Sequence, residues 1–251
     1  MTKQNKQGGF TLVEMSIVLV IIGLIVGGVL VGQDLIKAAR IRAVVAQIQS
    51  YDTSINAFMG KYDDIPGDIS QAVAFGLGAG SDGDGNGSLT PATAATHDGE
   101  IGNFWVHLSA ANMGDGSYAI GNVAGTNFPR TKLKKGGVIA LSDGSNLAWI
   151  VGTSNTLTDA TLANWTSSPA LTAPEAFGID SKLDDGVPVT GATVILDAIS
   201  TVPNNATATF DTTIANGAGG DDCVANGVNN VYNMSYSSNI CILKIRSSSG
   251  A

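Results

Sequence analysis

The chain of 251 residues has a formal net charge of −8, and 44% of its side chains are apolar while only 14% are charged. An acidic chain without a basic stripe argues against nucleic acid as a main partner, because phosphate binding needs clustered lysine and arginine. Its length suits one globular domain of about 190 residues together with a membrane-spanning helix.

The N-terminal segment combines a short basic leader with a long apolar run. Residues 1–9 contain two lysines and no acid, and Phe10–Gly32 contains a single charge, Glu14. As a helix this run spans roughly 35 Å, enough to cross a hydrocarbon core of about 30 Å. A secretory signal would place its apolar region before the cleavage site, whereas here the leader meets the run at Gly9. Because positively charged flanks of a membrane helix stay on the cytoplasmic side, we expect the two-lysine leader in the cytoplasm and the bulk of the chain outside.

The helix is expected to continue well past the apolar run. Residues 33–61 contain no proline, and their apolar side chains recur at steps of mostly three or four, which predicts a one-sided stripe that packs on the globular domain. The turn around Pro66 ends the helix. The expected division is a leader at 1–9, a helix at 10–62 with its membrane or assembly segment at 10–32, and a globular domain at 63–251.

The globular domain is expected to be α+β, a small antiparallel sheet with helical and loop insertions. Thr172 and Glu175 have the spacing of a capping box, which predicts a helix to Leu183. The other expected elements are helices at 68–75 and 100–111, a hairpin of 138–141 with 147–151, and strands at 192–196 and 240–245.

Cys223 and Cys241 are the two cysteines of the chain. An even pair in a chain that crosses a membrane predicts a disulfide, worth about 3 kcal/mol for a loop of this size. No spacing typical of a metal or redox cysteine motif is present.

An acidic glycine-rich loop has two interpretations. In the first, the loop is similar to the first half of an EF-hand-type calcium loop, because oxygen-bearing side chains occupy alternate positions, at Asp82, Asp84 and Asn86. The twelfth position is Thr93, so the closing glutamate is missing, although Asp98 or Glu100 could replace it. The alternative is a solvated turn without metal.

The sequence contains no motif of a catalytic site. The glycine-rich residues 76–80 do not follow an expected strand, and His97 and His107 have no partner at ligand spacing. An enzyme is therefore not expected, and calcium is the one cofactor that the sequence suggests.

The segment from Gly9 and Phe10 to Glu14, read Gly-Phe-Thr-Leu-Val-Glu and followed by the apolar run, resembles the processing site of type IV pilins and type II secretion pseudopilins. The resemblance implies that prepilin peptidase cleaves between Gly9 and Phe10 and that the new amine of Phe10 is methylated. It also implies that Glu14 receives the amine of a neighbouring subunit; the alternative is a glutamate that reaches the headgroups. The proline that often kinks this helix in the family is absent, and glycines such as Gly23 and Gly27 occur instead.

The resemblance implies a pilin-like fold and a structural role. We expect a prepilin, anchored by one helix in the inner membrane and then assembled into a periplasmic or extracellular type IV pilus-like fibre. The expected partners are other pilin subunits, prepilin peptidase, the inner-membrane assembly platform and membrane lipid. A disulfide between Cys223 and Cys241 would be similar to the C-terminal loop of many pilins. The alternatives are a type II secretion pseudopilin, or a membrane-anchored minor pilin acting as an adhesin or calcium-binding module.

Overall fold

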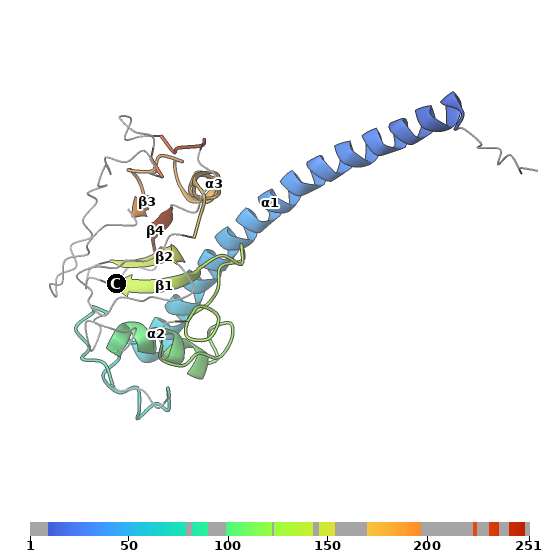
Figure 1. The fold of residues 1–251 in the computed structure, drawn as a ribbon. Helices are drawn as coiled ribbons and strands as arrows, with labels where there is room; N and C mark the ends of the chain where they lie inside the picture. Colours follow the sequence, from blue (N-terminus) through green and yellow to red (C-terminus); the bar gives the residue numbers. More distant parts are fainter. Residues whose placement is uncertain are drawn as a thin grey trace, which may run out of the picture. The chain divides into compact units, whose positions relative to one another are not determined.

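The computed structural model describes residues 10–78, 82–89, 99–121, 123–142, 146–153, 170–196, 223–224, 231–235 and 241–248. Its elements in chain order are α1 (Leu12–Tyr62), α2 (Gly99–Ala110), β1 (Gly137–Ser142), β2 (Leu147–Thr153), α3 (Ala173–Leu183), β3 (Thr193–Leu196) and β4 (Ile242–Arg246) (Figure 1). Contacts divide the chain into two units, residues 1–40 and residues 41–251. The expected α+β class, with a long N-terminal helix and a small antiparallel sheet, is confirmed.

Helix α1 is a single uninterrupted helix of 51 residues. The glycines of its apolar half do not break it, and no proline lies within it. It ends where Asp63 adopts a left-handed backbone conformation with φ of 57° and donates its N–H to the carbonyl of Met59 at 2.8 Å. Aspartate tolerates this conformation better than most residues, and Pro66 prevents the helix from resuming.

The second half of α1 buries the predicted stripe from Val44 onward, whereas Leu35 and Ile36, at the start of the prediction, remain exposed. Its buried side chains recur at helical spacing: Val44, Gln47, Ile48, Tyr51, Ile55 and Phe58. The ring of Tyr51 lies 4.8 Å from that of Trp105 on α2 and 5.4 Å from that of Trp149 on β2, measured between centroids. The stripe therefore forms one wall of the core, and aromatic contacts join it to both a helix and the sheet.

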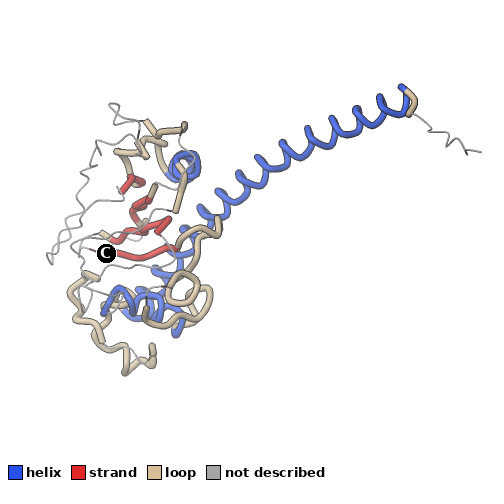
Figure 2. The backbone as a smooth tube through the Cα atoms, in the orientation of Figure 1, coloured by secondary structure: helices blue, strands red, loops and turns tan. Residues whose placement is uncertain are grey.

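The four strands form one antiparallel sheet in the order β1-β2-β4-β3 (Figure 2). The predicted hairpin is confirmed as β1 and β2, which pair from Gly137 opposite Thr153 to Ser142 opposite Leu147. Strand β4 lies between β2 and β3, and it pairs with both of them. Apolar side chains of β1, β2 and β4 are buried, so the sheet supplies the other wall of the core.

At Gly152, near the end of β2, no residue with a side chain fits. Its φ of 92° lies in the left-handed region, and a Cβ there would approach the Leu171 side chain to 2.5 Å. Leu171 in turn forms a bridge with Cys241, at the start of β4. The glycine therefore lets the chain before α3 lie directly on the sheet.

Two predicted helices have different outcomes. The capping box of α3 is confirmed, because Glu175 accepts hydrogen bonds from the backbone N–H and the hydroxyl of Thr172, at 2.9 and 3.0 Å. The predicted short helix from Asp68 to Phe75 is wrong, since these residues form successive turns. Asp68 does not cap a helix there; its carboxylate accepts hydrogen bonds from the backbone of the acidic loop instead.

Candidate functional site

The N-terminus of α1 has a capping box of its own. The backbone N–H and the hydroxyl of Thr11 both donate to Oε2 of Glu14 at 2.8 Å, and the N–H of Glu14 donates back to the Thr11 hydroxyl at 3.3 Å. Thr11 and Glu14 thus satisfy each other's hydrogen-bonding groups at the helix start, and these bonds fix the direction of the glutamate side chain. Gly9, the expected cleavage residue, lies outside the described residues, whereas Phe10 is described and 80% exposed.

An exposed apolar surface covers the first half of α1. Its side chains remain 44% to 85% exposed: Leu12, Val13, Met15, Ile17, Val18, Leu19, Val20, Ile21, Ile22, Leu24, Ile25, Val26, Val29, Leu30, Val31, Leu35 and Ile36. Within the described part of the chain, α1 alone is long and apolar enough to cross a membrane, with a mean hydropathy of 2.8 in its most apolar window. A continuous apolar surface of this size requires lipid or protein to cover it.

Residues 4–30 match the family model described as the prokaryotic N-terminal methylation motif. The chain therefore carries an N-terminal methylation motif, which supports its resemblance to the type IV pilin and pseudopilin family. The match spans residues 4–9 of the expected leader, the expected cleavage position, Glu14 and most of the exposed apolar surface. The family is structural rather than catalytic, so the motif supports a pilin-like or pseudopilin precursor.

Comparison with curated proteins and with solved structures found no match for the chain. The family resemblance therefore rests on the N-terminal motif together with the α+β architecture described above.

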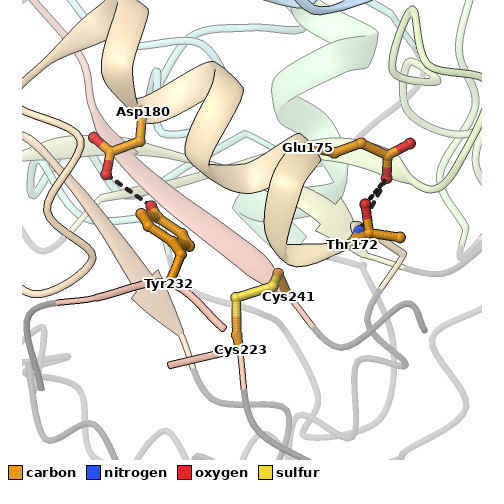
Figure 3. Close-up of a disulfide and its surroundings, with 6 residues drawn as sticks. All are labelled: Thr172, Glu175, Asp180, Cys223, Tyr232 and Cys241. Carbon is orange, nitrogen blue, oxygen red and sulfur yellow. Dashed lines mark hydrogen bonds between the residues drawn. A yellow bond between two sulfur atoms is a disulfide. The ribbon is translucent and has the colours of Figure 1, made fainter. Parts of the chain in front are cut away.

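The predicted disulfide joins Cys223 and Cys241, whose Cα atoms lie 5.2 Å apart (Figure 3). Both cysteines are buried, and Cys241 exchanges two backbone hydrogen bonds with Leu171, at 3.2 and 2.9 Å. The disulfide therefore attaches the segment containing Cys223 to the sheet at the start of β4. Such a C-terminal disulfide agrees with the pilin-like character of the motif.

The acidic loop is arranged around a residue that the sequence did not indicate. Asp68 is fully buried, and its carboxylate accepts from the backbone N–H groups of Gly85 at 2.9 Å and Gly87 at 2.7 Å. One carboxylate oxygen from each of Asp68, Asp84 and Glu100 lies within 4.8 Å of the others. Three carboxylates at this separation repel one another unless a proton or a cation lies between them.

Electrostatics at this cluster favour a shared positive charge. Burial, together with the charges of Glu100 and Asp64, raises the pKa of Asp68 to about 6, while the hydrogen bond from the Gly87 N–H opposes the shift. The residues predicted from the calcium-like pattern divide between two roles. Asp84 belongs to the cluster, whereas Asp82 accepts from the N–H of Val73 at 2.9 Å.

Asn86, the third predicted ligand, bonds within the loop. Its side-chain amide donates to Oδ2 of Asp84 at 2.7 Å, and its Oδ1 accepts from the Ser88 N–H at 2.7 Å. Calcium binding in this loop stays a prediction, and the oxygen ligands that the geometry offers for it are those of Asp68, Asp84 and Glu100.

Two of these features were missed in the sequence for different reasons. The Thr11–Glu14 capping box follows the ordinary Thr-x-x-Glu spacing, so a search for helix starts inside the apolar run would have found it. The role of Asp68 had no local signal, because its partners lie 17 to 19 residues further along the chain.

Proposed function

We propose that the chain is the precursor of a structural subunit of a type IV pilus-like fibre. The observation that carries this proposal is the coincidence of the methylation motif with the exposed apolar surface on a single helix. A membrane anchor alone needs the apolar surface but not the motif. An assembling subunit needs both, because the surface that first lies in lipid is later covered by the helices of neighbouring subunits.

In this proposal cleavage after Gly9 leaves the amine of Phe10 at the end of α1, where it is methylated. That amine pairs with the Glu14 carboxylate of a neighbouring subunit, because two opposite charges attract strongly in an apolar surrounding. Thr11 already donates two hydrogen bonds to one oxygen of Glu14. The second oxygen, Oε1, is the one that we assign to the incoming amine.

The partners follow from this sequence of events. Prepilin peptidase and the inner-membrane assembly platform act on the membrane-anchored precursor, and other pilin subunits cover α1 in the fibre. A type II secretion pseudopilin is the alternative, since the motif belongs to both groups.

Leader processing tests the proposal directly. Co-expression with prepilin peptidase should convert the wild-type chain to a product that begins at Phe10, as measured by intact mass. Gly9→Trp should block this conversion because the peptidase must approach the backbone closely, whereas the matched change Gly8→Ala should permit it. Equal processing of the Gly9→Trp chain would contradict the proposal.

Fibre assembly tests the role of Glu14. Glu14→Gln should be processed and inserted normally but should yield few or no fibres by electron microscopy, because the neutral amide cannot pair with the amine. Normal fibre numbers would remove the pairing from the proposal. Deletion of the gene separates the two groups: loss of surface fibres supports a pilin, whereas loss of protein secretion with fibres retained supports a pseudopilin.

A further inference from the structure

A second group of carboxylates lies where α3 ends. Asp180 is in the last turn of the helix, and Asp184 and Asp185 follow it directly. One carboxylate oxygen from each of the three lies within 4.8 Å of the others. Within the described part of the chain no salt bridge reaches any of them, so their charges are not balanced by lysine or arginine.

The turn between α3 and β3 holds two of these carboxylates in position. Asp185 accepts from the N–H of Val187 at 2.8 Å and from the hydroxyl of Thr190 at 2.7 Å. Oδ2 of Asp184 accepts from the N–H of Ala192 and, at 3.1 Å, from the N–H of Thr193. Both side chains are therefore fixed by the local backbone before any ligand is present.

Asp180 contributes an oxygen with no hydrogen bond. The residue is fully buried, and the hydroxyl of Tyr232 donates to its Oδ2 at 2.7 Å. Oδ1 has no hydrogen-bond partner, and Figure 3 shows the second carboxylate oxygen turned away from Tyr232. An ionised carboxylate oxygen that is buried without a donor is unfavourable, so a proton or a cation would stabilise this atom.

Thr193 contributes a second buried oxygen without a partner. The residue is fully buried, and its hydroxyl makes no hydrogen bond. The backbone N–H of the same residue donates to Asp184. The hydroxyl is three covalent bonds from that nitrogen, which is itself in contact with the cluster. The C-terminal end of α3 adds the negative end of a helix dipole to this position, which also favours a cation.

We propose that Asp180, Asp184 and Asp185 bind a hard divalent cation of the calcium class, with the hydroxyl of Thr193 as a further oxygen ligand. Calcium accepts carboxylate and hydroxyl oxygens in irregular arrangements, which suits ligands from a helix end and a strand. The ion joins α3 to β3, and through Tyr232 it also joins them to the segment that follows Cys223. This site is separate from the acidic loop and does not depend on the proposed fibre function.

Calcium titration of the full chain in detergent, after removal of metal with a chelator, tests the proposal. Asp84→Asn is introduced first, to remove the acidic loop as a competing site. This protein should bind one calcium by calorimetry, and adding Asp185→Asn should weaken that binding at least tenfold. The matched control is Asp115→Asn, an exposed acid far along the chain, which should leave the affinity unchanged. No calcium uptake, or equal affinity with Asp185→Asn, would overturn the proposal in favour of a proton shared by the carboxylates.

Terbium luminescence gives a second readout in the Asp84→Asn protein, which lacks the acidic loop as a competing site. Terbium replaces calcium at oxygen sites, and an adjacent tyrosine sensitises its emission; Tyr232 is hydrogen-bonded to Asp180. Excitation of tyrosine should produce emission that is lost in both Tyr232→Phe and Asp185→Asn. Circular dichroism shows whether each variant is folded. Emission that persists in both folded variants would overturn the proposal.

Discussion

The indole Nε1 of Trp149 donates a hydrogen bond of 2.8 Å to Oδ1 of Asp52, which joins the centre of the sheet to α1. The same carboxylate accepts from the hydroxyl of Ser247 at 2.6 Å and from the hydroxyl of Ser248 at 2.8 Å. One side chain on the helix therefore holds both strand β2 and the residues that follow β4.

The first prediction concerns this carboxylate. Asp52→Ala should lower the free energy of unfolding by about 2–4 kcal/mol, because it leaves the Trp149 indole N–H buried without an acceptor. Urea denaturation followed by tryptophan fluorescence measures the change. Asp115→Ala, at an exposed acid, is the control and should cost less than about 0.5 kcal/mol. Equal stability of the two variants would show that the Asp52 contacts contribute little.

The second prediction concerns the disulfide. Reduction should lower the free energy of unfolding by about 3 kcal/mol, because the link between Cys223 and Cys241, 18 positions apart, restricts the unfolded chain. Denaturation with and without reductant measures the difference. The double variant Cys223→Ser, Cys241→Ser should match the reduced protein and should not respond to reductant. A wild-type curve unaffected by complete reduction would contradict this prediction.

The third prediction is a pH dependence caused by His107. Its Nδ1 accepts from the N–H of Gly67 at 3.0 Å, and burial lowers its pKa to about 4 while the charge of Asp82 opposes the shift. The unfolded chain takes up this proton near pH 6.5, whereas the folded chain does so only near pH 4. The free energy of unfolding should therefore fall as the pH drops from 6.5 to 4, by on the order of 2–3 kcal/mol, and change no further below pH 4 on account of this residue.

The matched variant for this pH dependence is His107→Gln, whose side-chain oxygen can accept from Gly67 but does not titrate. Carboxylates that titrate in the same interval, such as Asp68, contribute equally to both proteins and cancel in the difference. Denaturation curves at several pH values should show a difference that grows between pH 6.5 and 4. A constant difference across that range would show that His107 protonates as easily when folded as when unfolded.

The fourth prediction separates the two possible ligand sets of the acidic loop. If calcium binds there, Asp84→Asn and Glu100→Gln should each abolish a calcium-dependent rise in melting temperature in an Asp185→Asn background, which removes the second proposed site, because both residues belong to the cluster with Asp68. Asp82→Asn should retain the rise, since Asp82 binds the N–H of Val73 instead. Loss of the rise in Asp82→Asn alone would favour the ligand set expected from sequence spacing. No rise in the Asp185→Asn protein would mean that the loop is a solvated turn.

Features with a local pattern were predictable from the sequence. The stripe on α1, the hairpin of β1 and β2 and the Thr172–Glu175 capping box each depend on residues within a few positions of one another. The methylation motif is equally local, which explains why the cleavage residues and Glu14 could be proposed without a structure.

Features that depend on distant parts of the chain were not predictable in this way. Asp52 and Ser247 are separated by 195 positions, and Tyr232 reaches Asp180 across 52. Asp184 and Asp185 look like an ordinary helix end until the fold places a buried Asp180 and a buried Thr193 beside them. Local propensity carries no information about such contacts, because tertiary packing alone creates them.

The position of β4 in the sheet has a consequence for biogenesis. Strand β4 is synthesised last of the four, yet it lies between β2 and β3 and pairs with both. In the proposed exported subunit, until residues 242–246 have crossed the membrane, β3 lacks the strand that pairs with it in the described part of the chain and β2 has an open edge, so the sheet cannot be completed during translocation. Contacts this distant in sequence also form slowly. The exported domain should therefore remain open to chaperones and proteases until its final strand arrives, and export and folding should finish almost together.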